Sequence, residues 1–364
     1  MASPVLDRRT LNRTLLARQH LLERVERPAL DMVEHLVGLQ AQEPPDPYAA
    51  LWSRIEGFDP AELAGAIVDR HAVRMGLLRG TLHLVTAADA RRLYPVLHDV
   101  LARSYRSSPF AKALAGADID AIVGAARDEL EIEPLTPTDL GRRLAVRWPD
   151  LDPQALAYTA RFLLPLVQVP PRGIWGRTGR PTNTTAEAWL GGPLEPASSV
   201  DEIVVRYLRA FGPASAADIR TWSWMTGLRP VMERLRPQLR TYRDESGREL
   251  FDVEDGVIAD PELPAPVRFL PQYDNVFLSH DDRSRVNGGL AWGIDFGRKS
   301  PVLVDGFIEG AWRVRRERRV ATMTLELTRR VPTSARGAVE DEAGRLFAFV
   351  AADAETRDLR VVLA

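Results

Sequence analysis

The 364-residue chain contains no cysteine, only two lysines and no long hydrophobic run. Without cysteine there can be no disulfides, zinc–thiolate sites or cysteine nucleophiles, and the composition suits a reducing cytoplasm. No segment approaches the roughly 20 apolar residues that a membrane-spanning helix needs. The first residues also lack the apolar core of a secretory signal. We therefore expect a cytoplasmic protein.

The motifs of several enzyme classes are absent as well. The chain has no GxGxxG or GxxxxGK[ST] loop for nucleotides, no HExxH zinc motif and no GxSxG nucleophile elbow. The nearest candidate metal cluster, His280-Asp281-Asp282, is better explained as a solvent-facing turn. His83 lies in an alternating apolar run, which favours a hydrogen-bonded strand residue over a catalytic base. We therefore expect no metal and no cofactor.

Charge is nearly balanced overall but is concentrated locally. The chain has 48 basic and 50 acidic residues, a net charge of −2. All basic residues except Lys112 and Lys299 are arginine, which suits phosphate and guanine contacts but also follows from a GC-rich genome. Residues 312–330 hold seven arginines against two glutamates, a local charge of +5.

Capping residues and apolar spacing divide the first 260 residues into three units, each with helices followed by a β hairpin. This order is typical of winged helices. The helices are expected at 11–22, 30–37, 46–57, 60–68, 138–147, 153–164, 200–211, 216–225 and 230–239. The hairpin strands are expected at 73–78 with 81–85, 166–169 with 174–176, and 239–242 with 249–253.

The remaining residues read as short β runs at 267–270, 276–279, 302–308, 311–314 and 322–327. A helix at 331–352 and a strand at 359–363 follow. We therefore predict an α+β fold with three tandem winged-helix units and a small C-terminal β-rich domain, together forming a concave DNA-binding surface. The predicted boundaries are 1–90, 91–190 and 198–260 for the winged helices and 261–364 for the C-terminal domain with its closing helix.

Gln40 and Gln42 are the candidate catalytic pair. They follow a helix that ends at Gly38, and a proline-rich turn comes next. In an extended segment, side chains two residues apart point the same way, so both amides would face one site. Each amide offers an acceptor and two donor hydrogens, which can hold a water or a base edge. Spacing alone favours a simple solvent-facing loop.

A resemblance to a known family changes that balance. The segments GLQAQ at 38–42 and YAALW at 48–52 resemble the glutamine-x-glutamine signature of the bacterial winged-helix DNA glycosylases of the AlkZ/YcaQ type. Further segments at 79–83, 270–275 with Asp282-Arg283, and 304–313 resemble the family in the same order. The YcaQ branch has an acidic residue where this chain has Gln42. The resemblance thus favours the AlkZ branch, which is associated with self-resistance to azinomycin.

The resemblance implies a monofunctional DNA glycosylase that hydrolyses the N-glycosidic bond of N7-alkylated purines. It would unhook interstrand crosslinks formed by an azinomycin-like natural product, with Gln40 and Gln42 as catalytic residues. The expected partner is double-stranded DNA carrying N7-alkylguanine or crosslink lesions, bound by a monomer at the bacterial nucleoid and with no membrane involved. The expected DNA contacts are Arg79, His83, Arg283, Arg298, Lys299, Arg313 and Arg315.

Two other functions fit the sequence. A non-catalytic winged-helix regulator is possible, although no dimerisation helix is evident. A protein that sequesters the alkylating drug also fits the near-neutral charge, and weak salt dependence of binding would distinguish it from a DNA-binding protein.

Trp222 and Trp224 lie two residues apart in an expected helix, so their side chains cannot both face the same core. One is expected in the core and the other at a domain interface or, less favourably, on DNA.

Overall fold

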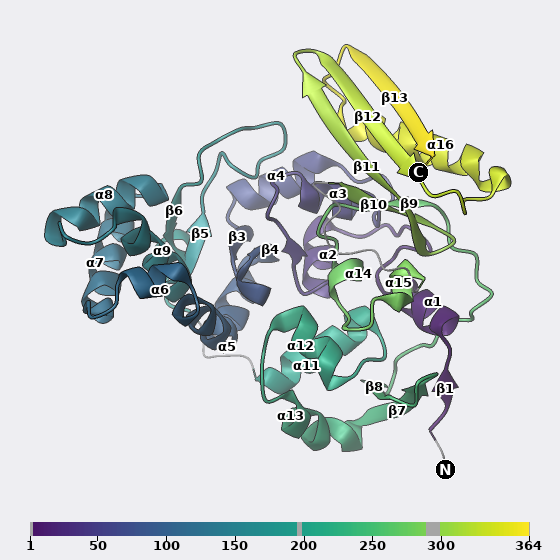
Figure 1. Cartoon of the computed structure of the whole chain (residues 1–364), viewed down its shortest axis with the longest axis horizontal. Helices are drawn as coiled ribbons and strands as arrows, with labels where there is room; N and C mark the ends of the chain where they lie inside the picture. The colour runs from purple at the N-terminus through teal and green to yellow at the C-terminus, as the bar shows by residue number, and fades with distance from the viewer. Residues whose placement is uncertain (1–2, 195–198, 289–298, 364) are drawn as a thin grey trace.

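The computed structural model describes residues 3–194, 199–288 and 299–363 as three β-sheets surrounded by helices, which confirms the α+β prediction (Figure 1). Among the described residues, no helix is both long enough and apolar enough to cross a membrane. The helices are α1 (Arg8–Arg18), α2 (Ala29–His35), α3 (Asp46–Trp52), α4 (Pro60–Val68), α5 (Ala87–Arg106), α6 (Pro109–Ala113), α7 (Ile119–Ile132), α8 (Pro137–Arg147), α9 (Pro153–Leu163), α10 (Ala186–Leu190), α11 (Val200–Phe211), α12 (Ala216–Ser223), α13 (Leu228–Leu235), α14 (Asn275–Leu278), α15 (Ser284–Asn287) and α16 (Thr333–Val350).

The first sheet carries the glutamine segment and is antiparallel, with strand order β2-β4-β3-β5-β6. Residues of both the first and the second predicted unit contribute strands to it. A short 3-10 helix, η1 (Leu78–Gly80), joins two of the strands. The strands are β2 (Leu39–Gln40), β3 (Ala72–Gly76), β4 (Leu82–Thr86), β5 (Leu166–Gln168) and β6 (Asn183–Thr185).

The strand expected at 174–176 is wrong, because β5 pairs with β6 instead. Residues 174–176 form turns, and Gly173 and Gly176 both have positive φ angles. The Trp175 ring packs against the Tyr48 ring, with centroids 4.8 Å apart, and its backbone N–H donates to the Tyr48 hydroxyl. Tertiary packing on helix α3 therefore explains the apolar side chains of this run.

The second sheet connects the N-terminus to the third predicted unit. Strand β1 (Val5–Leu6) pairs in parallel with β7 (Leu239–Asp244), which pairs in antiparallel fashion with β8 (Glu249–Val253). Helices α11, α12 and α13 precede the β7–β8 hairpin, as the sequence predicted. Ser199 and Ser215 cap α11 and α12 through their side chains.

The third sheet has the order β13-β12-β11-β10-β9, and Figure 1 shows it with α16 at one end of the molecule. The strand expected at 276–279 is wrong. Residues 276–278 belong to α14, which Asp274 caps, and Ser279 directly follows this helix. All four α14 side chains are buried, and a short run buried on every side does not distinguish helix from strand. The strands are β9 (Arg268–Phe269), β10 (Ser300–Val304), β11 (Phe307–Glu317), β12 (Val320–Leu327) and β13 (Thr356–Leu363).

A fully buried ion pair joins the end of α3 to the segment before α14. Arg54 donates to both carboxylate oxygens of Asp274, at 2.8 and 2.9 Å, and neither side chain is exposed. Arg54 also donates to the Gln19 side chain and the Ala50 carbonyl. The pair thus fixes three separate segments of the chain around one guanidinium.

We expect Asp274→Asn to lower the free energy of unfolding by about 3–5 kcal/mol, because it leaves the Arg54 charge buried without a counter-charge. Urea denaturation measures the change. Asp353→Asn is the matched control: its ion pair with Arg316 lies at the surface, so its loss should cost less than about 1 kcal/mol. Equal losses in the two variants would contradict this role for the buried pair.

Candidate active site

The two glutamines occupy different environments. Gln40 ends β2, where it pairs with His83 of β4, and it is 7% exposed. The Ala41 N–H donates to the Leu82 carbonyl at 2.8 Å, which continues the pairing by one residue. Gln42 follows in a bend and is exposed. Gln40 is thus a fixed interior group, and Gln42 faces the solvent beside it in the chain.

Arg79 holds the Gln40 side chain. Its Nη2 donates to Gln40 Oε1 at 2.7 Å, and its Nη1 donates to the Trp222 carbonyl in α12. Because a guanidinium only donates, the Gln40 carbonyl oxygen must face Arg79, and the amide NH2 is the free end. Arg79 has a left-handed backbone with φ 56°, a conformation that costs about 1–2 kcal/mol for a non-glycine residue.

His83 of β4 lies next to Arg79. Its Nδ1 donates to the Thr81 carbonyl at 3.0 Å, so Nε2 is the acceptor that faces Arg79 Nη2 at 3.4 Å. Burial and the Arg79 charge lower the pKa of His83 to about 3, so the ring is neutral at physiological pH. The expectation of a hydrogen-bonded strand residue is confirmed.

Arg74, which no sequence motif singles out, fixes the residue between the glutamines. Its Nη2 donates to the Ala41 carbonyl at 2.6 Å and its Nη1 donates to Gln168 Oε1 at 3.0 Å. A Cβ atom on Gly173 would lie 2.7 Å from Arg74 Cδ, so this site requires glycine. The available signal was a charged residue inside an otherwise apolar strand run.

Asn275 supports the start of the same segment. Its Nδ2 donates to the Gly38 carbonyl at 2.8 Å, and the side chain is buried. The motif at 270–275 was matched from the sequence, but its contact with the glutamine segment was not foreseen. The partners are 237 residues apart in the chain, so no local pattern reveals the contact.

A buried carboxyl lies four residues after Gln42. Asp46 begins α3 and is 9% exposed, and its Oδ2 has no hydrogen-bond partner among the residues that the structure describes. Burial, reinforced by the charges of Glu43 and Asp274, raises the pKa of Asp46 to about 8. The carboxyl is therefore mostly protonated at neutral pH.

The other predicted DNA contacts are distributed over two places. Arg283 is half-buried, and its guanidinium lies over the Phe277 ring, 4.9 Å from the ring centroid. Burial, together with the charge of Arg283, lowers the pKa of Arg79 to about 10. Arg313 and Arg315 are exposed on alternate positions of β11, in the third sheet. Lys299, directly before β10 of the same sheet, forms an ion pair with Glu326 of β12, and Arg298 lies outside the described residues.

The structure thus brings Gln40, Arg79 and His83 together, with Arg283 close enough to affect Arg79 electrostatically. It places Arg313 and Arg315 on a separate sheet, and Lys299 directly before β10 of that sheet. Arg79 and His83 have internal hydrogen-bond partners, so a role in contacting DNA stays a prediction for both.

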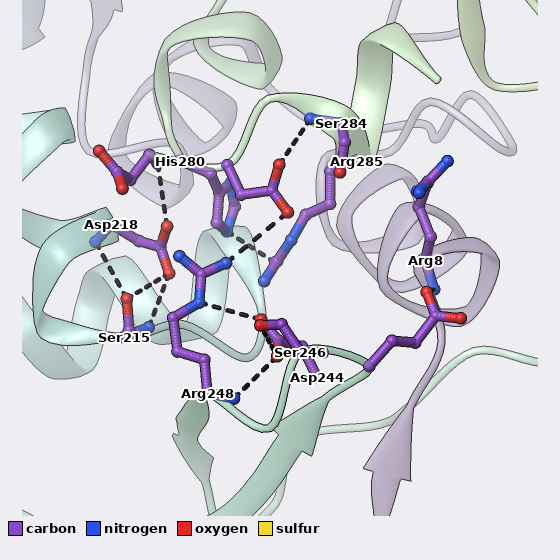
Figure 2. A network of polar contacts seen from close by, with 12 residues as sticks. Arg8, Ser215, Asp218, Asp244, Ser246, Arg248, His280, Ser284 and Arg285 are labelled. Carbon is purple, nitrogen blue, oxygen red and sulfur yellow. Dashed lines mark hydrogen bonds and ion pairs between the residues drawn. The ribbon is translucent and has the colours of Figure 1, made fainter. Parts of the chain in front are cut away.

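A second buried polar cluster joins α12, the β7–β8 turn and α15 (Figure 2). His280 Nε2 accepts from Arg285 Nη1 at 2.8 Å, and Asp218 accepts from the Asp281 N–H at 2.9 Å. The expectation of a solvent-facing turn is wrong for His280, because its side chain is buried. Its ring nitrogens bond to Ser279 and Arg285 in place of water. Within the described ranges, no group of three or more His, Cys, Asp or Glu side chains is placed to hold a metal.

The raised pKa of Asp46 predicts a specific pH dependence of stability. Its folded-state pKa of about 8 lies above the ordinary value of 3.8, so the folded chain holds this proton more tightly. The contribution of the group to stability is therefore full at low pH and is lost as pH rises through this window. Asp46→Asn removes the titration, so the unfolding free energy of the variant should rise relative to wild type between about pH 5 and about pH 8.5.

Urea denaturation at the two pH values gives this difference, and the exposed Asp150→Asn is the matched control. A difference between Asp46→Asn and wild type that stays constant with pH would contradict the raised pKa.

Comparison with known proteins identifies the family of the chain. A family model described as DNA glycosylase AlkZ-like matches residues 33–349. An interstrand DNA cross-link repair glycosylase from Streptomyces sahachiroi is 25% identical over 370 residues, which cover 91% of this chain and 93% of that protein. The solved structure of the Streptomyces sahachiroi DNA glycosylase AlkZ has a TM-score of 0.75 at 20% identity, covering 98% of this chain and 100% of that one. The chain belongs to the AlkZ-like DNA glycosylase family.

Proposed function

We propose that this protein hydrolyses the N-glycosidic bond of N7-alkylated purines in double-stranded DNA and unhooks interstrand crosslinks formed by an azinomycin-like natural product. The observation that carries the proposal is the fixed amide of Gln40, whose oxygen accepts from Arg79, two residues before the exposed Gln42. The similarity to the Streptomyces sahachiroi cross-link repair glycosylase supports the choice of lesion. Such an activity serves self-resistance or DNA repair.

The chemistry of the lesion explains why neutral amides suffice. Alkylation at N7 of guanine places a positive charge on the base, which makes it a good leaving group. No general acid has to protonate it, in contrast to the sugar leaving group of ordinary glycoside hydrolysis. What remains is to orient a water toward the anomeric carbon, and orientation contributes up to ~7–11 kcal/mol in ideal cases.

The hydrogen bonds of the site divide the roles of the two glutamines. Arg79 takes the carbonyl oxygen of Gln40, so Gln40 offers N–H donors to the water or to an oxygen of the lesion nucleotide. Gln42 is exposed, and its carbonyl accepts a hydrogen bond from the attacking water. The cationic base leaves as a neutral molecule, and the water's extra proton passes to the solvent. The neutral His83 supports Arg79 and takes no proton from the water.

A monofunctional enzyme, without lyase chemistry, fits the placement of the two lysines. A β-lyase step needs an amine nucleophile near the sugar. Lys112 is exposed on α6, and Lys299 is paired with Glu326 at 2.7 Å. Neither is among the residues that contact Gln40 in the described part of the chain.

The chain is proposed to form three tandem winged helices, with the boundaries expected from the sequence, that curve around the duplex. In this proposal β5 and β6 are the hairpin of the second unit and extend the sheet of the first. Exposed arginines of the β11 strand, with Arg283, Arg298 and Lys299, are proposed to contact phosphates. The enzyme is proposed to act as a monomer in the bacterial cytoplasm, at the nucleoid, because its substrate is chromosomal DNA.

Gln42→Ala is expected to slow single-turnover base release from N7-methylguanine DNA and from a crosslinked duplex by at least about tenfold, because the water loses its orientation. DNA affinity should be unchanged. The surface glutamine Gln154 supplies the matched control, since Gln154→Ala removes an exposed amide from α9 and should leave the rate as it is.

If wild type releases no base from either substrate yet binds duplex DNA in a salt-sensitive way, the glycosylase proposal fails and a regulator is left. If it binds the alkylating drug without salt dependence and releases no base, the drug-sequestering function is left.

Arg79→Lys is expected to reduce the rate of base release by about ten- to a hundredfold, because a single ammonium cannot reproduce the planar fork that holds Gln40 and the Trp222 carbonyl together. Single-turnover kinetics measure the rate, with thermal melting as the test of folding. Arg142→Lys, at an exposed position of α8, is the matched control. A wild-type rate in folded Arg79→Lys would show that Gln40 acts without this support.

A further inference from the structure

A surface pocket of about 430 Å³ lies between α5 and the C-terminal end of α12. Its lining includes Arg103, Ser104, Arg220 and Trp224. It adjoins the glutamine site through η1: a Cβ atom on Gly80 would lie 3.5 Å from Ser104 Oγ, and the neighbouring Arg79 bonds both Gln40 and the Trp222 carbonyl. One guanidinium therefore separates Gln40 from the end of the helix that carries this pocket.

Trp224 has two unusual properties in this pocket. Its side chain is 51% exposed, although tryptophan is mostly buried in folded proteins. Its backbone is left-handed, with φ 63°, a region that bulky residues rarely adopt and that glycine adopts freely. Arg103 Nη2 donates to the Trp224 carbonyl at 2.9 Å and so holds the residue there. Strain of this kind in a folded protein is concentrated at binding and catalytic sites.

The charge of the pocket complements a phosphate. Arg103 and Arg220 both line it, and no carboxylate does. Within the described ranges neither arginine has an ion-pair partner, whereas many other arginines of this chain do. One acidic residue, Asp281, is hydrogen-bonded to the lining: it accepts from the Thr221 hydroxyl at 3.2 Å. Two unpaired cations beside an exposed aromatic ring are the elements that bind an unstacked nucleotide.

We propose that this pocket holds a nucleotide of the DNA strand displaced next to the lesion, with its base stacked on Trp224 and its phosphate bound by Arg103 and Arg220. The inference rests on the proposed function. A crosslinked guanine is tethered to the opposite strand and cannot swing out freely, so the catalytic amides need a neighbouring nucleotide to move instead. Stacking on tryptophan accepts any base, which suits a position beside the lesion.

Trp224→Gly tests the stacking. Glycine adopts the left-handed backbone without strain, so the variant should melt at the same temperature as wild type or higher. Its affinity for a duplex with a tetrahydrofuran abasic analogue at the lesion position should fall by about tenfold, measured by fluorescence anisotropy. Trp224→Phe keeps an aromatic ring and should retain most of the affinity. Wild-type affinity in Trp224→Gly would overturn the proposal.

Arg220→Ala tests the phosphate contact, because this side chain is exposed and has no ion pair in the described structure. The slope of log affinity against log salt is negative, and its magnitude should fall by about 0.7–0.9, the value for one phosphate. Arg142→Ala, at an exposed position of α8, should leave the slope unchanged. An unchanged slope in Arg220→Ala would contradict phosphate binding in the pocket.

Base release from N7-methylguanine DNA separates this inference from the proposed function. If wild type releases the base and Trp224→Gly binds as tightly as wild type, the pocket proposal fails and the glycosylase proposal stands. If wild type releases no base, the proposed function fails whatever the pocket binds. If Trp224→Gly loses affinity only for DNA that carries a bulky aromatic adduct, the pocket accepts the adduct and the nucleotide proposal is overturned.

Discussion

The structure of the site depends on satisfying the polar groups of one buried segment, residues 38–41. Three acceptors there lie inside the protein: the carbonyls of residues 38 and 41 and the side-chain oxygen of Gln40. Asn275, Arg74 and Arg79 donate to them. An unsatisfied buried acceptor costs about 1–3 kcal/mol, so each of these donors fixes the segment in one position. The donors come from α14, β3 and η1, and the segment is thereby tied to three distant parts of the chain.

The use of an amide at position 40 follows from its partner. A carboxylate there would form an ion pair with Arg79 and would have no hydrogen left to donate. An amide accepts from the guanidinium with its oxygen and still offers two hydrogens to a substrate. Burial lowers the pKa values of Arg74 and Arg79 to about 10, which leaves both cationic at neutral pH. The glutamine segment thus lies among positive charges, which suits a polyanionic substrate.

The sequence predicted those features that depend on neighbouring residues. Ser199 and Ser215 cap helices where the capping pattern placed them, and strands form on both sides of Arg79 where short apolar runs predicted them. The predictions failed where tertiary contacts decide the conformation, as in the turn at 174–176 and the helix at 275–278. Arg79 looked like a residue near a wing tip, yet its partners are Gln40 and α12, which no spacing rule connects. The glutamine pair itself was selected by family resemblance, since its spacing alone favoured a solvent-facing loop.

Helix α12 links the glutamine site to the polar cluster of Figure 2, because hydrogen bonds hold it at both ends. At its N-terminal end, Asp218 accepts from the Asp281 backbone within the cluster of Figure 2. At its C-terminal end, Arg79 and Arg103 donate to the carbonyls of Trp222 and Trp224. A helix of eight residues is a rigid element about 12 Å long. The position of Trp224 relative to Gln40 is therefore set by hydrogen bonds at both helix ends, and a change at either end should move the exposed ring relative to the amide.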